Sequence, residues 1–405
     1  MPEAVIVSAA RSPIGRAYKG SLASIRPDDL AAQMVAAALA KVPELDPTEV
    51  DDLMMGCGQP AGQSGFNIAK VVATTLGYDF MPGVTVHRYC SSSLQTTRMA
   101  MHAIRAGEGD VYISAGVESV SSFKTGTADG WPDTKNARYD EAQARSAKLA
   151  EGGIPWTDPR DAGLLPDIYL GMGHTAENVA SLTGISREDQ DHWGVRSQNR
   201  AEAAINAGFF EREISPVTLA DGTVVSTDDG PRAGTTYEKV SGLKAIFRPD
   251  GTVTAGNACP LNDGAAALVI MSDTKAKALG LTPLARVVAT AATGLSPEIM
   301  GLGPIEAVKK ALGYANMSTS DIDLYEINEA FAVQVLGSAR ALDLDEDKIN
   351  ISGGAIALGH PFGMTGARIT ATLINNLQTQ DKQFGVETMC VGGGQGMAMV
   401  IERLS

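Results

Sequence analysis

Residues 84–107 read VTVHRYCSSSLQTTRMAMHAIRAG, and this stretch decides the fold class. The apolar, β-branched run 84–89 predicts a strand, and the residues from about Cys90 to Gly107 have the spacing of a helix. A strand that runs directly into a helix is the repeating unit of α/β proteins. Cys90 lies at the junction, where the dipole and free amides of a first helical turn favour an anion. We therefore expect a lowered thiol pKa there, the alternative being a small cysteine buried in the core.

Strand and helix patterns alternate along the rest of the chain in two similar series. Apolar runs predict strands at 4–10, 51–56, 111–116, 264–271, 284–290, 322–327 and 387–392. Helical spacing predicts helices at 27–42, 67–76, 304–313, 330–340 and 363–377. The stretch 119–248 is richer in Asp, Gly, Pro and charge, and it holds all three tryptophans. We predict an α/β protein of two similar halves, 1–118 with 249–273 and 274–405, interrupted by an insertion at 119–248.

The composition excludes several classes of protein. A net charge of −14 over 405 residues repels DNA and anionic membranes, which argues against a general nucleic-acid binder. No apolar run reaches the roughly 18 to 20 residues of a membrane span, and the N-terminus lacks the basic region of a signal peptide. Four separated cysteines without a CxxC pattern indicate reduced thiols in a cytoplasm, and they predict no metal site.

A histidine in a glycine-rich turn is the second candidate site residue. His360 lies in NISGGAIALGHPFGMTGAR, residues 350–368, just before a predicted helix. Glycines on both sides leave the ring uncovered, so His360 could act as the general base for a nearby thiol. The alternative is a turn histidine bonded to a carbonyl.

Two further motifs follow predicted strands. Cys390 lies in ETMCVGGGQG, where Gly392 begins a run of exposed backbone amides of the kind an oxyanion hole needs. Asn328, in EINEAFA, could orient a water molecule, the alternative being a structural helix cap. We expect all four site residues at the C-terminal ends of strands, where ligands bind in α/β sheets. Two thiols, a histidine and an asparagine in such places favour acyl transfer by a thiolate nucleophile, and no GxSxG motif supports a serine hydrolase.

Long motifs in this order resemble those of the thiolase family over essentially the whole chain. They include AVIVSAARSPIG (4–15), HRYCSSSLQ (87–95), GNACPLNDGAAAL (256–268), NEAFA (328–332) and CVGGGQGMA (390–398). The resemblance implies a five-layer αβαβα fold with two pseudo-equivalent halves and a loop domain inserted into the first. The boundaries expected from composition agree with that organisation.

The resemblance also implies a role for each site residue. Cys90 would be the nucleophile that carries the acyl group, and His360 would activate it. His360 and a water held by Asn328 would form one oxyanion hole, and the amides of Cys90 and Gly392 would form a second. Cys390 would be the acid and base that exchanges the proton of the α-carbon.

Coenzyme A is implied as a substrate, with no covalently bound cofactor. By resemblance, Arg232 lies near the adenine and phosphate end of CoA. Met172 lines the pantetheine and acyl tunnel, and Ala255 and Phe331 pack along pantetheine. Cys259 stands where the family often has a serine in the CoA-binding segment. Gly171 stands where biosynthetic members commonly carry a histidine. The net charge of −14 then predicts a locally positive CoA entrance around Arg232 on an otherwise acidic surface.

We expect a degradative 3-ketoacyl-CoA thiolase, which cleaves its substrate with CoA to acetyl-CoA and a shortened acyl-CoA, as in β-oxidation of fatty or related acids. CSSSLQ is closer to the CSSGLQ of degradative thiolases. One alternative is a biosynthetic acetyl-CoA acetyltransferase, which runs the same chemistry as a Claisen condensation. Another is a non-catalytic thiolase-like protein that binds acyl-CoA or lipid. We expect a homodimer or homotetramer.

Overall fold

One large sheet runs through the protein, whose computed structural model describes all 405 residues. The strand order is β10-β11-β12-β9-β1-β8-β5-β3-β4, with β2 paired to β8. The first-half strands are β1 (Ala4–Arg11), β2 (Gly15–Arg16), β3 (Asp52–Cys57), β4 (Gly83–Val86), β5 (Val111–Ser119) and β8 (Asn262–Ser272). The second-half strands are β9 (Ala285–Gly294), β10 (Leu324–Ile327), β11 (Phe384–Val391) and β12 (Gln395–Arg403).

The two halves of the sheet repeat one strand pattern. In the first half β3 and β5 are parallel, and β8 and β1 follow with antiparallel pairing. In the second half β10 and β11 are parallel, and β12 and β9 follow with antiparallel pairing. The halves join where β1 meets β9 through only two residue pairs, Val5 with Arg286 and Ile6 with Ala285.

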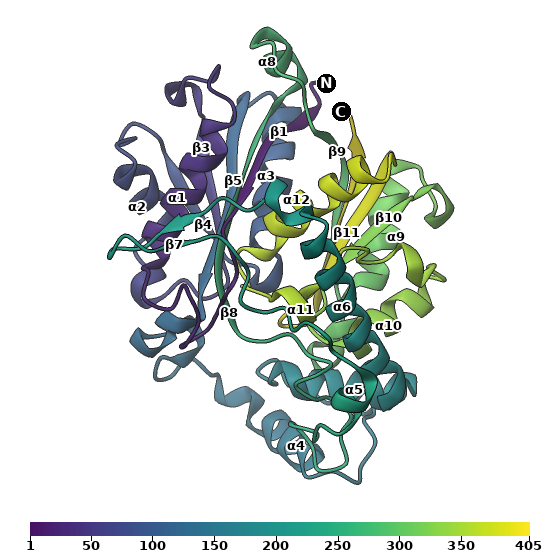
Figure 1. Cartoon of the computed structure of the whole chain (residues 1–405). Helices are drawn as coiled ribbons and strands as arrows, with labels where there is room; N and C mark the ends of the chain where they lie inside the picture. Colours follow the sequence, from purple (N-terminus) through teal and green to yellow (C-terminus); the bar gives the residue numbers. More distant parts are fainter.

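Side-chain alternation along the strands builds five layers, as the sequence analysis expects. On β1, Val5 packs toward the outer helices α1 (Pro27–Ala40) and α2 (Ile68–Thr75), whereas Ile6 packs toward the middle of the molecule. The middle layer is α3 (Ser92–Ala106) against α12 (Thr365–Thr379), and α9 (Gly303–Ala315) and α10 (Ala332–Ala341) cover the opposite outer face. Figure 1 shows α3 and α12 between the two halves.

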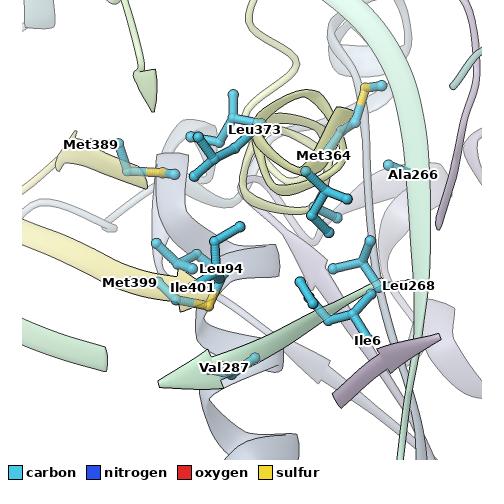
Figure 2. Packing of buried hydrophobic residues seen from close by; sticks show 14 of the residues in the cluster. Ile6, Leu94, Ala266, Leu268, Val287, Met364, Leu373, Met389, Met399 and Ile401 are labelled. Carbon is cyan, nitrogen blue, oxygen red and sulfur yellow. The ribbon is translucent and has the colours of Figure 1, made fainter. Parts of the chain in front are cut away.

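The middle layer has the most complete burial. Leu94 of α3 and Leu373 of α12 are fully buried, together with Ile6, Leu268 and Met399 from the facing strands (Figure 2). Each such side chain contributes about 1.5–3 kcal/mol relative to an exposed one. The helices that follow Cys90 and His360 in the chain are therefore packed closely against each other.

The inserted region adds no strand to the large sheet. Between β5 and β8 the chain forms α4 (Asp140–Ala150), α5 (Met172–Thr183), α6 (Arg187–Asn206), α7 (Tyr237–Ser241) and the two-stranded sheet of β6 (Val217–Thr218) and β7 (Val224–Val225). In Figure 1, α4 and α5 lie below the sheet. No helix in the structure combines the length and the apolar character needed to cross a membrane.

One predicted helix begins later than expected, and the structure contains a strand and a short helix that were not predicted. The helix after Cys90 begins at Ser92, because residues Tyr89–Ser91 form a separate 3-10 turn. No predicted element corresponds to β12 or to the short helix α8 (Asp273–Ala278). The glycine run at 392–394 masks the start of β12, although it is the turn that joins β11 to β12.

Candidate active site

Cys90 lies in the tight turn between β4 and α3. Tyr89, just before it, has φ of +41°, which a bulky residue adopts only where its surroundings hold it. Ser92 supports the turn, because its hydroxyl accepts the N–H of Arg88 at 2.9 Å and donates to the carbonyl of Tyr89 at 2.7 Å. Cys90 is buried, and the amide N–H groups of Gly392 and of Cys90 itself approach its sulfur. The turn thus brings together the two amides expected to form an oxyanion hole.

The expected lowering of the Cys90 pKa is wrong for this structure. Burial raises the pKa of the Cys90 thiol to about 12, and the amides of Gly392 and Cys90 offset only part of this effect. The dipole argument fails because α3 begins two residues later, so Cys90 is not in its first turn. A thiol with this pKa carries its proton at neutral pH, so it can react as a nucleophile only if a base removes that proton.

His360 is held as a neutral base by a hydroxyl neighbour. Its Nδ1 lies 2.6 Å from Thr365 Oγ1, and that hydroxyl donates its own hydrogen to the carbonyl of Pro361 at 2.8 Å. Because that hydroxyl hydrogen goes to Pro361, Nδ1 carries a proton and donates to Thr365, and Nε2 is the unprotonated ring nitrogen, with Asn328 Nδ2 at 3.3 Å. Burial lowers the pKa of His360 to about 3, so the resting ring is neutral. The alternative of a turn histidine bonded to a carbonyl does not describe this ring.

The loop around His360 differs from the one expected. His360 follows the one-turn helix α11 (Ala355–Leu358) and not a strand, so its expected place at a strand end is wrong. Its backbone N–H donates to the side-chain oxygen of Asn262 at 3.0 Å, which attaches the loop to β8. The first half of the protein therefore helps to position His360, which belongs to the second half.

Asn328 lies beside His360, just after β10. Its Nδ2 is 3.3 Å from His360 Nε2, and its Oδ1 is buried without a partner. It is not a helix cap, because Phe331 takes the N-cap position of α10. An unpartnered amide oxygen inside a site is where a polar ligand or water binds.

The next residue, Glu329, fixes this loop, and the sequence analysis misses it. Its carboxylate accepts the indole N–H of Trp193 at 3.0 Å, the hydroxyl of Ser197 at 2.6 Å and the side-chain amide of Asn350 at 2.9 Å. These contacts attach the Asn328 loop to α6 of the inserted region. A carboxylate directly after a candidate site residue is the only signal in the sequence that could have found it.

Three thiols gather at the site. Cys390, near the end of β11, is fully buried, and its pKa is raised first by burial and then by the nearby Cys90 and Cys259. Burial raises the pKa of Cys259 as well, with Cys90 and Glu329 adding to the effect. The backbone N–H of Cys259 donates to the carbonyl of Ala330 at 3.1 Å. Cys259, expected on the pantetheine, thus lies within electrostatic reach of both other thiols.

A cavity of about 500 Å³ opens beside Cys90. Gly392 and Met172 line it with Cys90, together with a polar wall of Gln59, Tyr89, Asp129, Thr134, Lys135 and Tyr169. Gln59 and Asp129 pair twice across this wall, side chain to side chain at 2.5 Å and backbone N–H to side chain at 3.2 Å. Met172 therefore lines the same cavity as Cys90.

A separate cavity of about 270 Å³ contains the residues expected at the CoA entrance. Arg232, Lys239 and Ala255 line it, and its lining includes no carboxylate. Arg232 and Lys239 are the charged residues that line this cavity, and the positive CoA entrance around Arg232 stays a prediction. Phe331 lines neither cavity. It packs edge to face on Phe247, with ring centroids 6.4 Å apart.

Family models match nearly all of the chain. The description "Thiolase, N-terminal domain" fits residues 4–274, and "Thiolase, C-terminal domain" fits residues 281–403. The chain belongs to the thiolase family. Thiolases are acyltransferases that act on acyl-CoA, and so is this protein.

Several thiolases that are named for different substrates resemble this chain to nearly the same degree. A 3-ketoacyl-CoA thiolase of Bacillus subtilis (strain 168) is 42% identical, over 99% of this chain and 100% of that protein. A 3-oxoadipyl-CoA/3-oxo-5,6-dehydrosuberyl-CoA thiolase of Escherichia coli (strain K12) is 43% identical over 100% of both. The crystal structure of a Bacillus anthracis acetyl-CoA acetyltransferase has a TM-score of 0.85 at 40% identity, covering 100% of this chain and 99% of that one. The family and the chemistry are thus established, while the relatives differ in the substrates they are named for.

Proposed function

We propose that the protein is a degradative thiolase that cleaves 3-ketoacyl-CoA with free CoA. His360 Nε2 takes the proton of Cys90 while the sulfur attacks the keto carbon. The bond between this carbon and the α-carbon then breaks. Cys390 donates its proton to the α-carbon of the departing acetyl-CoA enolate and becomes a thiolate.

The second half of the cycle returns every proton. The Cys390 thiolate takes the thiol proton of an incoming CoA, and the CoA thiolate attacks the acyl group on Cys90. Cys90 leaves as a thiolate and recovers its proton from the His360 imidazolium. The products are acetyl-CoA and an acyl-CoA two carbons shorter. The amides of Cys90 and Gly392 stabilise one oxyanion, and His360 with a water on Asn328 stabilises the other.

The observations that carry this proposal are the unprotonated Nε2 of the buried His360 ring and a buried Cys90 thiol whose pKa is too high for spontaneous ionisation. An acyl-enzyme tests it. Incubation with a 3-ketoacyl-CoA but no CoA should add one acyl mass to the peptide that contains Cys90. Finding the label on Cys57 or Cys259 instead would contradict the assignment.

The cavity beside Cys90, which we call the acyl cavity, has a size that supports the degradative direction of the reaction. An acetyl group has two carbons, and about 500 Å³ beside Cys90 leaves room for a longer chain. A biosynthetic acetyl-CoA acetyltransferase is the alternative. Thiolysis rates over 3-ketoacyl-CoAs of graded length and branching separate the two, because activity confined to acetoacetyl-CoA would favour the alternative.

CoA binding is proposed at the cavity of Arg232 and Lys239, with Ala255, Cys259, Met172 and Phe331 along the path to Cys90. Replacing Arg232 by alanine should raise the KM for CoA with little change in kcat, because an exposed cation there binds ground state and transition state alike.

We also propose that the insertion 119–248 forms the CoA-binding domain. The protein is further proposed to be a homodimer or homotetramer, and light scattering measures this oligomeric state.

The non-catalytic alternative predicts a different result. A protein that only binds acyl-CoA should keep CoA binding while Cys90 resists iodoacetamide. The sequence keeps Cys90, His360 and Cys390 within the motifs that resemble those of the family, which favours the enzyme.

A further inference from the structure

Glu118 is a buried carboxylate that no proposed catalytic step uses. It is the last but one residue of β5 and has no exposed surface. Its Oε2 accepts the backbone N–H groups of Gly58 at 2.7 Å and Gly363 at 2.8 Å, and its Oε1 accepts that of Gln59 at 3.1 Å. The Cys57 sulfur lies 3.9 Å from Oε1. No cation balances this carboxylate, and amides supply the contacts that favour its charged form.

The three amides belong to segments that build the site. Gly363 is three residues after His360, in the loop that begins α12, and it follows Phe362. Phe362 and Gln59 both line the acyl cavity beside Cys90. The ring of Phe362 also packs edge to face on His360, with centroids 5.2 Å apart. One carboxylate of the first half therefore holds the base loop of the second half and one wall of the acyl cavity.

The surroundings leave this arrangement little freedom. A Cβ on Gly58 would lie 2.6 Å from Glu118 Oε2 and 2.9 Å from the Cβ of Phe362. A Cβ on Gly363 would collide with the carbonyl oxygen of Val117. Glycine at both positions lets the two loops approach β5 closely enough for their amides to reach the same carboxylate.

We propose that Glu118 is a positioning residue for the reaction: its carboxylate sets the His360 loop and the Gln59–Phe362 wall against the nucleophile. The inference rests on the proposed function. Burying this charge raises the pKa of Glu118 to about 7, an energetic cost that shape alone does not explain. The charge of Glu118 also raises the pKa of Cys90, which provides a readout that a purely structural residue lacks.

Replacing Glu118 with glutamine tests the proposal. Glutamine keeps the size, but its NH₂ group would face an amide N–H and cannot accept it, so one segment must move. An unsatisfied buried donor costs about 1–3 kcal/mol, which predicts a fall in kcat of about 5- to 150-fold. Loss of the charge should shift the pH midpoint of Cys90 alkylation to lower values, because a nearby anion no longer opposes the thiolate.

Glu177→Gln is the matched control. Glu177 is also a buried carboxylate that accepts backbone amides, those of Thr252 at 2.9 Å and Val253 at 2.9 Å, but it lines neither the acyl cavity nor the Arg232 cavity. It should lose thermal stability while kcat and the alkylation midpoint of Cys90 stay near those of the unmodified protein.

The outcomes separate the two proposals. A kcat of E118Q equal to that of E177Q, or an unchanged alkylation midpoint, would overturn the positioning role while leaving thiolysis intact. Absence of acyl-Cys90 in the unmodified protein would overturn the proposed function itself. If E118Q does not fold, E118D serves: it keeps the charge but draws it back, so kcat should fall without a shift in the Cys90 midpoint. A kcat of E118D equal to that of the unmodified protein would overturn the proposal.

Discussion

Replacing Thr365 with valine should slow catalysis while the packing of the site stays nearly unchanged. Valine has nearly the same shape as threonine but has no hydroxyl, so His360 Nδ1 loses the acceptor that lies 2.6 Å away. The buried ring then has two choices. It keeps the Nδ1 proton unsatisfied, or it moves the proton to Nε2, where the lone pair needed to deprotonate Cys90 is lost.

The structure sets the size of the effect. His360 is 1% exposed, so water cannot easily replace the lost acceptor. A buried unsatisfied N–H costs about 1–3 kcal/mol, which corresponds to a fall of about 5- to 150-fold in the rate of acylation. The loss should appear in kcat and in kcat/KM alike, because the contact supports the transition state more than substrate binding.

Single-turnover acylation of Cys90, followed by mass spectrometry, measures this rate directly. Thr365→Ser is the control, since it keeps the hydroxyl and should retain most of the activity. The argument for the His360 tautomer would be refuted if the folded valine variant acylated Cys90 as fast as the serine variant.

Three further results are expected. Cys390→Ser should slow exchange of the α-carbon proton far more than acylation of Cys90, because serine is the weaker acid. Equal losses in isotope exchange and in acylation would contradict separate roles for Cys390 and Cys90. The pKa of Glu118 is raised to about 7 from the usual 4.5. As pH rises from about 5 to 8, the unmodified protein should therefore lose about 3 kcal/mol of unfolding free energy relative to E118Q, measured by urea unfolding. A difference in unfolding free energy that does not change with pH would contradict this. The sign follows because the buried group prefers its proton, so its stabilisation is present at low pH and lost as pH rises through 7. Gly366→Ala should destabilise by about 1–3 kcal/mol, because its Cβ would meet the backbone of Leu94 between α12 and α3; an unchanged melting temperature would disprove that close packing.

Much of the fold could be predicted because its strands and helices carry strong local patterns. The segment after Cys90 has helical periodicity and VYISAG of β5 is a short run typical of a buried strand, and both signals are local. β12 was missed because its strand signal begins inside a glycine turn, and only its pairing with β11 and β9 defines it. Long ladders of this kind form between segments far apart in the chain, so local sequence says little about them.

The candidate site, like the fold, could be predicted only in part from the sequence. The motifs around Cys90, His360 and Cys390 name the reactive groups, since residue type decides what a side chain can do chemically. The sequence could not reveal that Thr365 sets the tautomer of His360, that Glu118 holds its loop, or that burial raises the pKa of Cys90. A pKa and a tautomer depend on desolvation and on hydrogen-bond partners, and these come from segments that meet only in the folded chain. By itself the sequence determined which chemistry is available, and the tertiary structure decided the protonation state and geometry in which it operates.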